Sequence, residues 1–386
     1  MTLPSTQTPP PSPASASPLT PAPAPPSPAV RFPVTWLMEH AAAPIRYRAL
    51  TDVVKVGAPA SQEIATLPFT FRPALTLGLM QATDGTWNHS MLGIPSSKAT
   101  HFEGVGTINA VHRLLEYGWD RESPPLLHAR RVLFRLLAED DDPEYLFELA
   151  GSKALDEDMS RRGRAILREA AAAALAHAGY EGDPRLRGAA RRILERVVGF
   201  LRSPLAQKPF VRVGNQHVLA NEAAPPSMYA LMMLAHMPLF RTEHRDAMDR
   251  LYNFLIQPLP RQEAVQLCGS KIVPQPHLVL GDRLPNRNAV DADVVAAIAW
   301  LELMARLGFL RRNENWSKLF ERFVDDSDKQ GVWHPHKGAS AARTTDPFVW
   351  HMYPLEESLA GDERWTDVTF RIGLIARLSG RTIEPV

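Results

Sequence analysis

The sequence contains a single cysteine, almost no net charge and no long apolar run. Cys268 alone excludes an internal disulfide framework and any zinc site built on a Cys-x-x-Cys pair. The 43 Lys and Arg residues nearly balance the 42 Asp and Glu residues, which argues against a nucleic-acid partner or a polybasic membrane-surface protein. No apolar run approaches the roughly 18 residues that a membrane-spanning helix needs. The composition therefore predicts a large protein with no membrane span and no nucleic-acid partner.

Proline, by contrast, is abundant, and eleven of the 35 prolines lie within residues 1–30. Ala, Ser and Thr separate these prolines, and the stretch has no charged side chain. Such a segment cannot bury enough apolar surface to offset the entropy of ordering. It also lacks the basic and apolar regions of a secretory signal. We therefore expect a disordered tail over residues 1–31 and one domain over 32–386, in a cytoplasmic protein.

Beyond the tail, apolar residues recur with the 3.6-residue period of a helix, and no convincing run alternates as a strand does. Several expected helices begin with a capping side chain followed by proline, at Ser123-Pro124, Asp142-Pro143 and Asp183-Pro184. Helices are expected near 34–55, 61–82, 104–118, 124–138, 143–150, 159–178, 184–202, 226–237, 243–257, 291–308, 314–325 and 366–379.

The expected helices are of two kinds. After Asp183, an apolar stripe from Leu186 to Leu201 is flanked by charged residues, which is typical of a helix with one solvated face. The stretch Val294–Leu307 leaves little polar face and must be covered on most sides. About twelve helices of these two kinds favour two concentric layers, an α/α toroid, in an all-α protein. A solenoid is disfavoured because no strict repeat of roughly 30–45 residues is present.

One short motif carries a family resemblance. Gln81-Ala82-Thr83-Asp84-Gly85-Thr86-Trp87 resembles the Gln…Asp-Gly-x-Trp signature of the terpenoid cyclase and protein prenyltransferase superfamily. Asp328-Lys329-Gln330-Gly331-Val332-Trp333 is similar to a weaker second copy. The resemblance implies an α/α toroid in which such segments follow inner helices, Gly makes the turn, and Trp87 and Trp333 brace neighbouring helices.

The catalytic motifs of that superfamily are not matched. Glu139–Asp142 departs from the Asp-x-Asp-Asp proton donor of class II cyclases at its first position, and Asp325–Asp328 has the wrong spacing for a class I magnesium motif. Cys268 is preceded two positions earlier by Gln266, so the Asp-x-Cys zinc motif of protein prenyltransferases fails at its first ligand. No metal ligand is therefore assigned, and the cofactor is unknown.

Two long segments without helical pattern, residues 84–103 and 333–357, are rich in chemically capable side chains. Loops of this length in a compact helical domain are commonly functional. If the helices close into a ring, the two segments become neighbours. The predicted acid–base residues are His101, Glu103, His334 and His351. The predicted ligand-binding residues are Asp84, Trp87, Trp333, Trp350, Tyr353 and Glu356.

Three functions remain open at this stage. The leading one is a prenyltransferase-like or cyclase-like toroid that binds an apolar or isoprenoid small molecule in a central cavity. The second is a carbohydrate-active toroid, a polysaccharide lyase or glycosidase, that uses a pair such as Glu103 and His351. The third is a binding or scaffold protein without catalysis, because every catalytic motif tested above fails. Neither the reaction nor the oligomeric state follows from the sequence.

Overall fold

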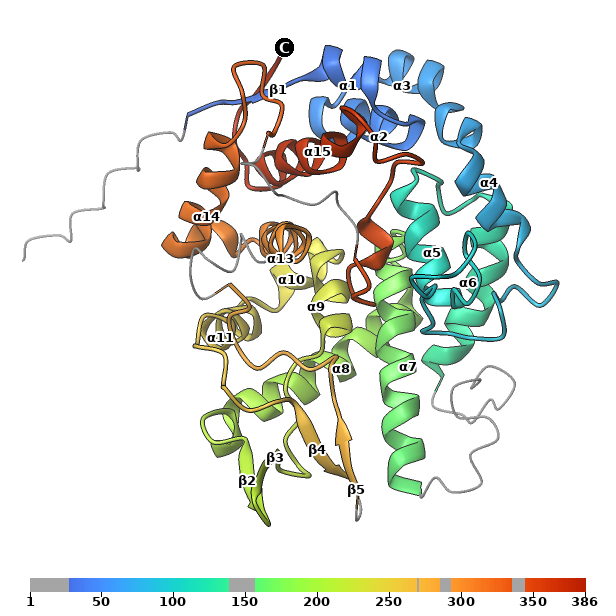
Figure 1. The fold of residues 1–386 in the computed structure, drawn as a ribbon. Coiled ribbons are helices and arrows are strands. Elements are labelled where there is room, and N and C mark those ends of the chain that lie inside the picture. Colours follow the sequence, from blue (N-terminus) through green and yellow to red (C-terminus); the bar gives the residue numbers. More distant parts are fainter. Residues whose placement is uncertain (1–27, 139–156, 269–270, 285–292, 335–343) are drawn as a thin grey trace, which may run out of the picture.

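The computed structural model describes residues 28–138, 157–268, 271–284, 293–334 and 344–386 (Figure 1). These residues are mostly helical, as predicted. The α-helices are α1 (Val34–His40), α2 (Ala43–Arg48), α3 (Ala58–Ile64), α4 (Arg72–Leu79), α5 (Thr107–Glu116), α6 (Pro124–Leu137), α7 (Glu157–His177), α8 (Pro184–Arg202), α9 (Met228–Ala235), α10 (Pro238–Glu243), α11 (Arg245–Leu255), α13 (Val294–Arg306), α14 (Glu314–Asp325) and α15 (Glu363–Leu378). Short turns of other helix types include η1 (Ala49–Val54), η2 (Leu67–Thr70), η5 (Pro204–Ala206), η6 (Leu310–Arg312) and η7 (Trp350–Met352).

Helices that follow a capping side chain begin where the sequence predicts. Helix α8 covers the expected 184–202, and the Asp183 carboxylate accepts a hydrogen bond of 2.9 Å from the backbone N–H of Arg185. Helix α14 covers the expected 314–325 with Asn313 as its cap. Ser123 differs: Pro124 opens α6 as predicted, but the Ser123 side chain makes no capping hydrogen bond. The expected helix near 143–150 lies outside the described residues.

The prediction of an all-α protein is wrong in one respect, because two small sheets are present. Strand β1 (Val30–Phe32) pairs in parallel with β6 (Ile383–Pro385), so the predicted tail boundary at residue 31 is too late. The second sheet joins two hairpins, β2 (Phe210–Val213) with β3 (Gln216–Leu219) and β4 (Val265–Cys268) with β5 (Lys271–Pro274), through a parallel contact of β3 with β4. Strands of three or four residues are too short to establish an alternating pattern.

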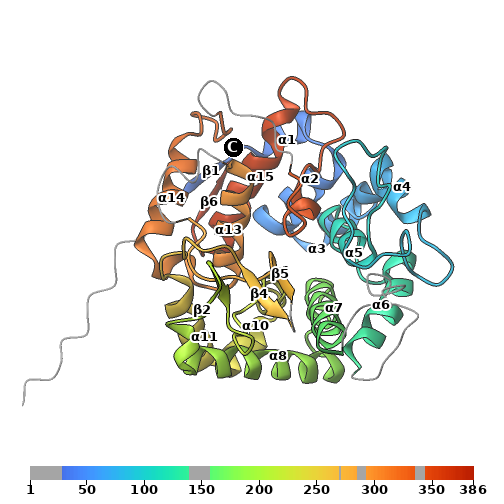
Figure 2. The ribbon, with the colours of Figure 1, turned by 60° about the horizontal axis from the view of Figure 1, so that its bottom comes forward.

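Five helices form a chain of contacts around the middle of the molecule. Helix α5 packs against α7, α7 against α9, α9 against α13, and α13 against α15. Buried ion pairs close the circuit, because Arg371 of α15 contacts both Glu302 of α13 and Glu116 of α5. Helices α4, α6, α8, α11 and α14 lie at the periphery of the view in Figure 2. Within the described ranges, no helix is both long and apolar enough to cross a bilayer.

Trp87 and Trp333 occupy equivalent local structures. Both side chains are buried, and each backbone N–H donates a 3.1 Å hydrogen bond to a threonine hydroxyl, that of Thr107 or that of Thr369. The glycine two residues before each tryptophan has a positive φ, +90° at Gly85 and +89° at Gly331. The two sequence copies therefore build the same turn against the helices α5 and α15.

Gly331 gives the first testable prediction. A Cβ at this residue would lie 2.6 Å from the backbone carbonyl oxygen of Arg31, in strand β1. Gly308 also has a positive φ, +77°, but a Cβ there has no atom within 4 Å. Because backbone strain is common to both, we expect Gly331→Ala to lower the free energy of unfolding by about 2–4 kcal/mol and Gly308→Ala by about 1 kcal/mol. Urea unfolding measures both values, and equal losses would contradict the close approach of β1.

Candidate functional site

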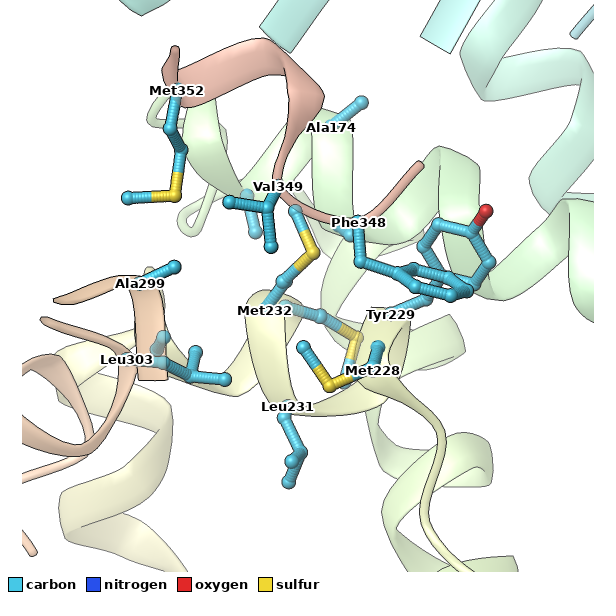
Figure 3. Packing of buried hydrophobic residues seen from close by; sticks show 14 of the residues in the cluster. Ala174, Met228, Tyr229, Leu231, Met232, Ala299, Leu303, Phe348, Val349 and Met352 are labelled. Atoms are coloured by element: carbon cyan, nitrogen blue, oxygen red, sulfur yellow. The ribbon is translucent and has the colours of Figure 1, made fainter. Parts of the chain in front are cut away.

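A cavity of about 50 Å³ lies between α9, α13 and the segment around η7. One wall is apolar. Figure 3 shows Met228 and Met232 of α9 facing α13 and the segment that precedes η7. The apolar lining consists of Met228, Met232, Ala296, Ala299, Trp300, Leu303, Phe348, Val349 and Met352.

The methionine wall follows from the composition of α9. Every residue from Met228 to Ala235 is buried, so the helix has no solvated face. The Ser227 hydroxyl caps it by accepting a 3.0 Å hydrogen bond from the backbone N–H of Ala230. Methionine side chains are unbranched and flexible, so a wall made of them adapts to the shape of a ligand.

The opposite end of the cavity is charged. Arg371 donates to Glu302 at 2.9 Å and to Glu116 at 2.5 Å. Arg48 also donates to Glu116, and its Nε donates to Asp52 at 2.9 Å. Arg306 donates to Glu302 at 2.8 Å. These side chains come from α2, η1, α5, α13 and α15, so the network connects elements that are far apart in the sequence.

The network keeps Glu116 ionised. Burial by itself raises the pKa of this carboxyl group, but the guanidinium groups of Arg371 and Arg48 hold the pKa well below its ordinary value. The pKa of Arg371 is raised, because its attraction to Glu116 and Glu302 outweighs its burial. The centre of the molecule therefore contains fixed charges in matched pairs.

Four histidines adjoin this network. The Nδ1 atoms of His112 and His177 are 2.8 Å apart, and His177 Nε2 lies 3.6 Å from a carboxylate oxygen of Glu116. The ring of His236 lies 4.3 Å from that of His177, and the ring of His351 lies 4.8 Å from that of His112. We call His112, His177, His236 and His351 the histidine cluster. His177, His236 and His351 line the cavity.

All four rings are held in the neutral form. Burial lowers the pKa of each, to about 4 for His112 and well below the ordinary value for His177, His236 and His351. The histidines also disfavour one another's charge, and Arg306 or Arg371 opposes protonation at three of them. Glu116 attracts the charged form of each ring, but less strongly than burial repels it. The cluster therefore presents neutral imidazoles near pH 7.

Two fully buried nitrogen atoms of the cluster have no hydrogen-bond partner among the described residues. They are His112 Nε2 and His351 Nδ1, and both are buried. Buried polar atoms in native proteins are almost always paired, so these two need a partner that a ligand or water supplies. In the described part of the chain, no group of three or more His, Cys, Asp or Glu side chains has an arrangement that could hold a metal ion.

Of the four predicted acid–base residues, only His351 lies at this site. His101, Glu103 and His334 are exposed, and His334 lies 3.3 Å from Asp328. Nothing in the structure brings these three side chains to the cavity. The two predicted segments do touch, because the Phe102 ring packs edge-on against the Trp350 ring at 6.3 Å.

The six predicted ligand-binding residues do not line the cavity either, and each has a contact of its own. Asp84 is exposed and caps the turn at Thr86, whereas Trp87 and Trp333 are buried beside α5 and α15. Trp350 packs against the guanidinium of Arg113 at 4.7 Å. Tyr353 is fully buried. Glu356 accepts hydrogen bonds from Ala42 N–H and the Thr366 hydroxyl, and burial raises its pKa to about 7.

The sequence interpretation missed most of the polar end of the cavity. The missed residues lie on helices or at their ends, whereas the sequence patterns indicated functional residues in long loops. They are Glu116, His177, His236, Glu302 and Arg306. A signal was present at Glu302, because a charged residue inside a helix that is otherwise covered must have a buried partner. His177 follows a run of alanines in a covered helix, so it too must have a buried partner.

Comparison with models of known protein families, with curated proteins and with solved structures finds no match.

Proposed function

We propose that the protein is an α/α toroid whose central cavity binds a small amphipathic ligand with an apolar part of the isoprenoid kind. The observation that carries this proposal is the cavity itself, which has a methionine-rich wall on one side and the histidine cluster on the other. A concave site that is mainly apolar, with a few convergent polar groups, is the usual form of a small-molecule site.

Two features support a toroid. The chain of contacts from α5 through α7, α9 and α13 to α15 returns to α5 through the Arg371–Glu116 ion pair. The matching turns at Trp87 and Trp333 abut α5 and α15, which are the first and last helices of that circuit. Both features agree with the sequence resemblance to the terpenoid cyclase and protein prenyltransferase superfamily.

The size of the cavity limits the ligand. A free volume of about 50 Å³ corresponds to roughly four water molecules. A long polyprenyl chain does not fit this space unless Met228, Met232 and Met352 change rotamer. We therefore propose a short ligand, of about one isoprene unit, for the cavity in this form. The presence of a cavity weighs against a pure scaffold, and its methionine wall favours an apolar group over the faces of a sugar.

The test uses the methionines as reporters. In protein labelled with ¹³C at the methionine methyl groups, the short alcohol 3-methyl-2-buten-1-ol is expected to shift the signals of Met228, Met232 and Met352. Met248, which is buried on α11 and does not line the cavity, is the internal control. A uniform absence of shifts, or shifts at Met248 alone, would contradict the proposed site.

A cavity-filling substitution sharpens this test. Ala299 lines the cavity, so Ala299→Phe places a ring in the ligand space and is expected to abolish the shifts. The matched control is Ala247→Phe, at a half-buried position on α11 away from the cavity, which is expected to leave them unchanged. Binding that survives Ala299→Phe would place the ligand elsewhere.

A further inference from the structure

Each arginine that lines the central cavity is paired with a carboxylate. Arg306 donates to Glu302, and Arg283 lies 3.8 Å from Asp346. Arg371, behind the lining, is shared between Glu116 and Glu302. Each of these guanidinium groups thus has a carboxylate within 4 Å, which leaves no unpaired guanidinium among the described lining residues to receive an anion.

The helix ends at the polar end of the cavity also disfavour an anion. Glu116 ends α5, His177 ends α7, His236 follows the last residue of α9, and Arg306 ends α13. The C-terminal end of a helix carries partial negative charge from its unpaired carbonyl groups. Anions are bound at the opposite end of helices, so this site favours hydrogen-bond donors over a diphosphate or carboxylate.

Hydrogen-bond logic fixes the proton positions in the cluster. The ionised Glu116 carboxylate lies 3.6 Å from His177 Nε2, and its negative charge favours the tautomer of His177 that carries the proton on this nitrogen. His177 Nδ1 is then an acceptor, and the 2.8 Å contact requires that His112 Nδ1 donates to it. A neutral imidazole has one donor, so His112 Nε2 is a bare acceptor.

His351 brings a second unpartnered imidazole nitrogen to the cavity. Its side chain lines the cavity, it is only 4% exposed, and its Nδ1 has no partner among the described residues. Arg113 fixes its position by donating hydrogen bonds of 3.0 Å and 3.2 Å to the carbonyl oxygens of His351 and Tyr353. Arg113 is therefore a positioning residue, and the imidazole of His351 is preorganised toward the ligand space.

We infer that the polar end of the central cavity recognises a neutral hydroxyl group, which hydrogen-bonds to the unpartnered Nδ1 of His351 and donates to it when the imidazole proton is on Nε2. This inference rests on the ligand site proposed above and adds the class of head group to it. The ligand is thus an alcohol, in which the hydroxyl meets the histidine cluster and the hydrocarbon meets the methionine wall. A hydroxyl group is also present on sugars, and the experiment separates the two sources.

The experiment compares four probes that differ in one feature. They are 3-methyl-2-buten-1-ol, the hydrocarbon 2-methyl-2-butene, which lacks the hydroxyl, the diphosphate of the same alcohol, and glucose. Binding is followed by the methionine methyl signals, and the His351 ring is followed by ¹⁵N shifts. We expect the alcohol to bind about tenfold more tightly than the hydrocarbon and to move the ¹⁵N signal of His351 Nδ1, which the hydrocarbon leaves in place.

His351→Phe removes the acceptor and keeps an aromatic ring. We expect this variant to bind the alcohol about tenfold more weakly and the hydrocarbon unchanged, because one hydrogen bond is lost. His351→Gln, which restores an acceptor oxygen, is expected to recover part of the difference. His334→Phe, at an exposed histidine outside the cavity, is the matched control. If His351→Phe does not fold, the ¹⁵N shift in the wild-type protein decides the question.

The outcomes separate the two proposals. If the alcohol and the hydrocarbon bind equally and His351 is silent, the hydroxyl inference is wrong and the apolar site stands. Tightest binding by the diphosphate also overturns the inference. If glucose binds most tightly and shifts the His351 signal, the hydroxyl inference is supported, but the proposed isoprenoid ligand is wrong and a sugar takes its place. If no probe shifts Met228, Met232 or Met352, both proposals fail.

Discussion

Replacement of Arg371 by methionine is expected to lower the free energy of unfolding by about 3–5 kcal/mol. Arg371 is fully buried and contacts Glu116 and Glu302, which are themselves buried. Its loss leaves two carboxylates with fewer cationic partners in a medium that solvates charge poorly. Glu116 keeps Arg48 and Glu302 keeps Arg306, so the network is weakened at its centre. Urea unfolding followed by circular dichroism measures the change.

The control for this prediction is an exposed ion pair. Lys318→Met removes the contact of Lys318 with Glu314, both more than 60% exposed, and is expected to leave the free energy of unfolding almost unchanged, because water screens exposed charges. Adding Glu116→Gln and Glu302→Gln to Arg371→Met is expected to recover part of the loss, because it removes the uncompensated charges. A loss below about 1 kcal/mol for Arg371→Met would show that the buried network is not formed.

Mild acid is expected to destabilise the protein before ordinary carboxylates titrate. The four rings of the histidine cluster have pKa values below that of an unfolded histidine, about 6.5. The unfolded state therefore binds more protons as the pH falls below about 6.5, and the stability falls with it. Their contribution is fully present above that pH and is lost as the pH falls toward 4.

Two buried carboxyl groups act in the opposite direction. Burial raises the pKa of Glu356 to about 7 and that of Asp367 to about 6, so the folded state takes up protons at these groups in the same pH range. Burial also lowers the pKa of His277 and raises that of Asp282, which add one group to each side. The unfolded state is left with a net excess of about two bound protons, which corresponds to a loss of about 2.7 kcal/mol per pH unit near pH 5. Urea unfolding at pH 7, 6 and 5 measures the slope.

A single variant checks the origin of this slope. His112→Phe removes one buried imidazole and is expected to reduce the slope by about 1.4 kcal/mol per pH unit, since one proton fewer is involved. His334→Phe removes an exposed histidine and is expected to leave the slope as it is. Stability that is level, or that rises, between pH 7 and 5 would contradict a buried neutral cluster.

Local signals in the sequence were sufficient for most of the helices. Helices α8 and α14 begin after Asp183 and Asn313 because those side chains cap the first turn, and this depends only on neighbouring residues. Strand β1 could not be found in this way. It has three residues, and its partner β6 lies at the other end of the chain, so its existence depends on how the termini meet.

The candidate site was only partly predictable for the same reason. His351 was identified because it lies in a long segment without helical pattern. His112, His177 and His236 come from three different regions that meet only when α5, α7 and α9 pack together. No spacing along the chain encodes that meeting. His101 and Glu103 were singled out by their loop, but chemical capability in an exposed loop does not place a side chain at a cavity.

Four neutral histidines adjoin the cavity, and their tautomers can be measured directly. Long-range ¹H–¹⁵N spectra of protein labelled at histidine, assigned with single variants, report the protonation of each ring nitrogen. We expect His112, His177, His236 and His351 to stay neutral at pH 6, with the proton of His112 on Nδ1 and that of His177 on Nε2. A ring among these four that titrates near pH 6.5, or the reverse pair of tautomers, would contradict this prediction.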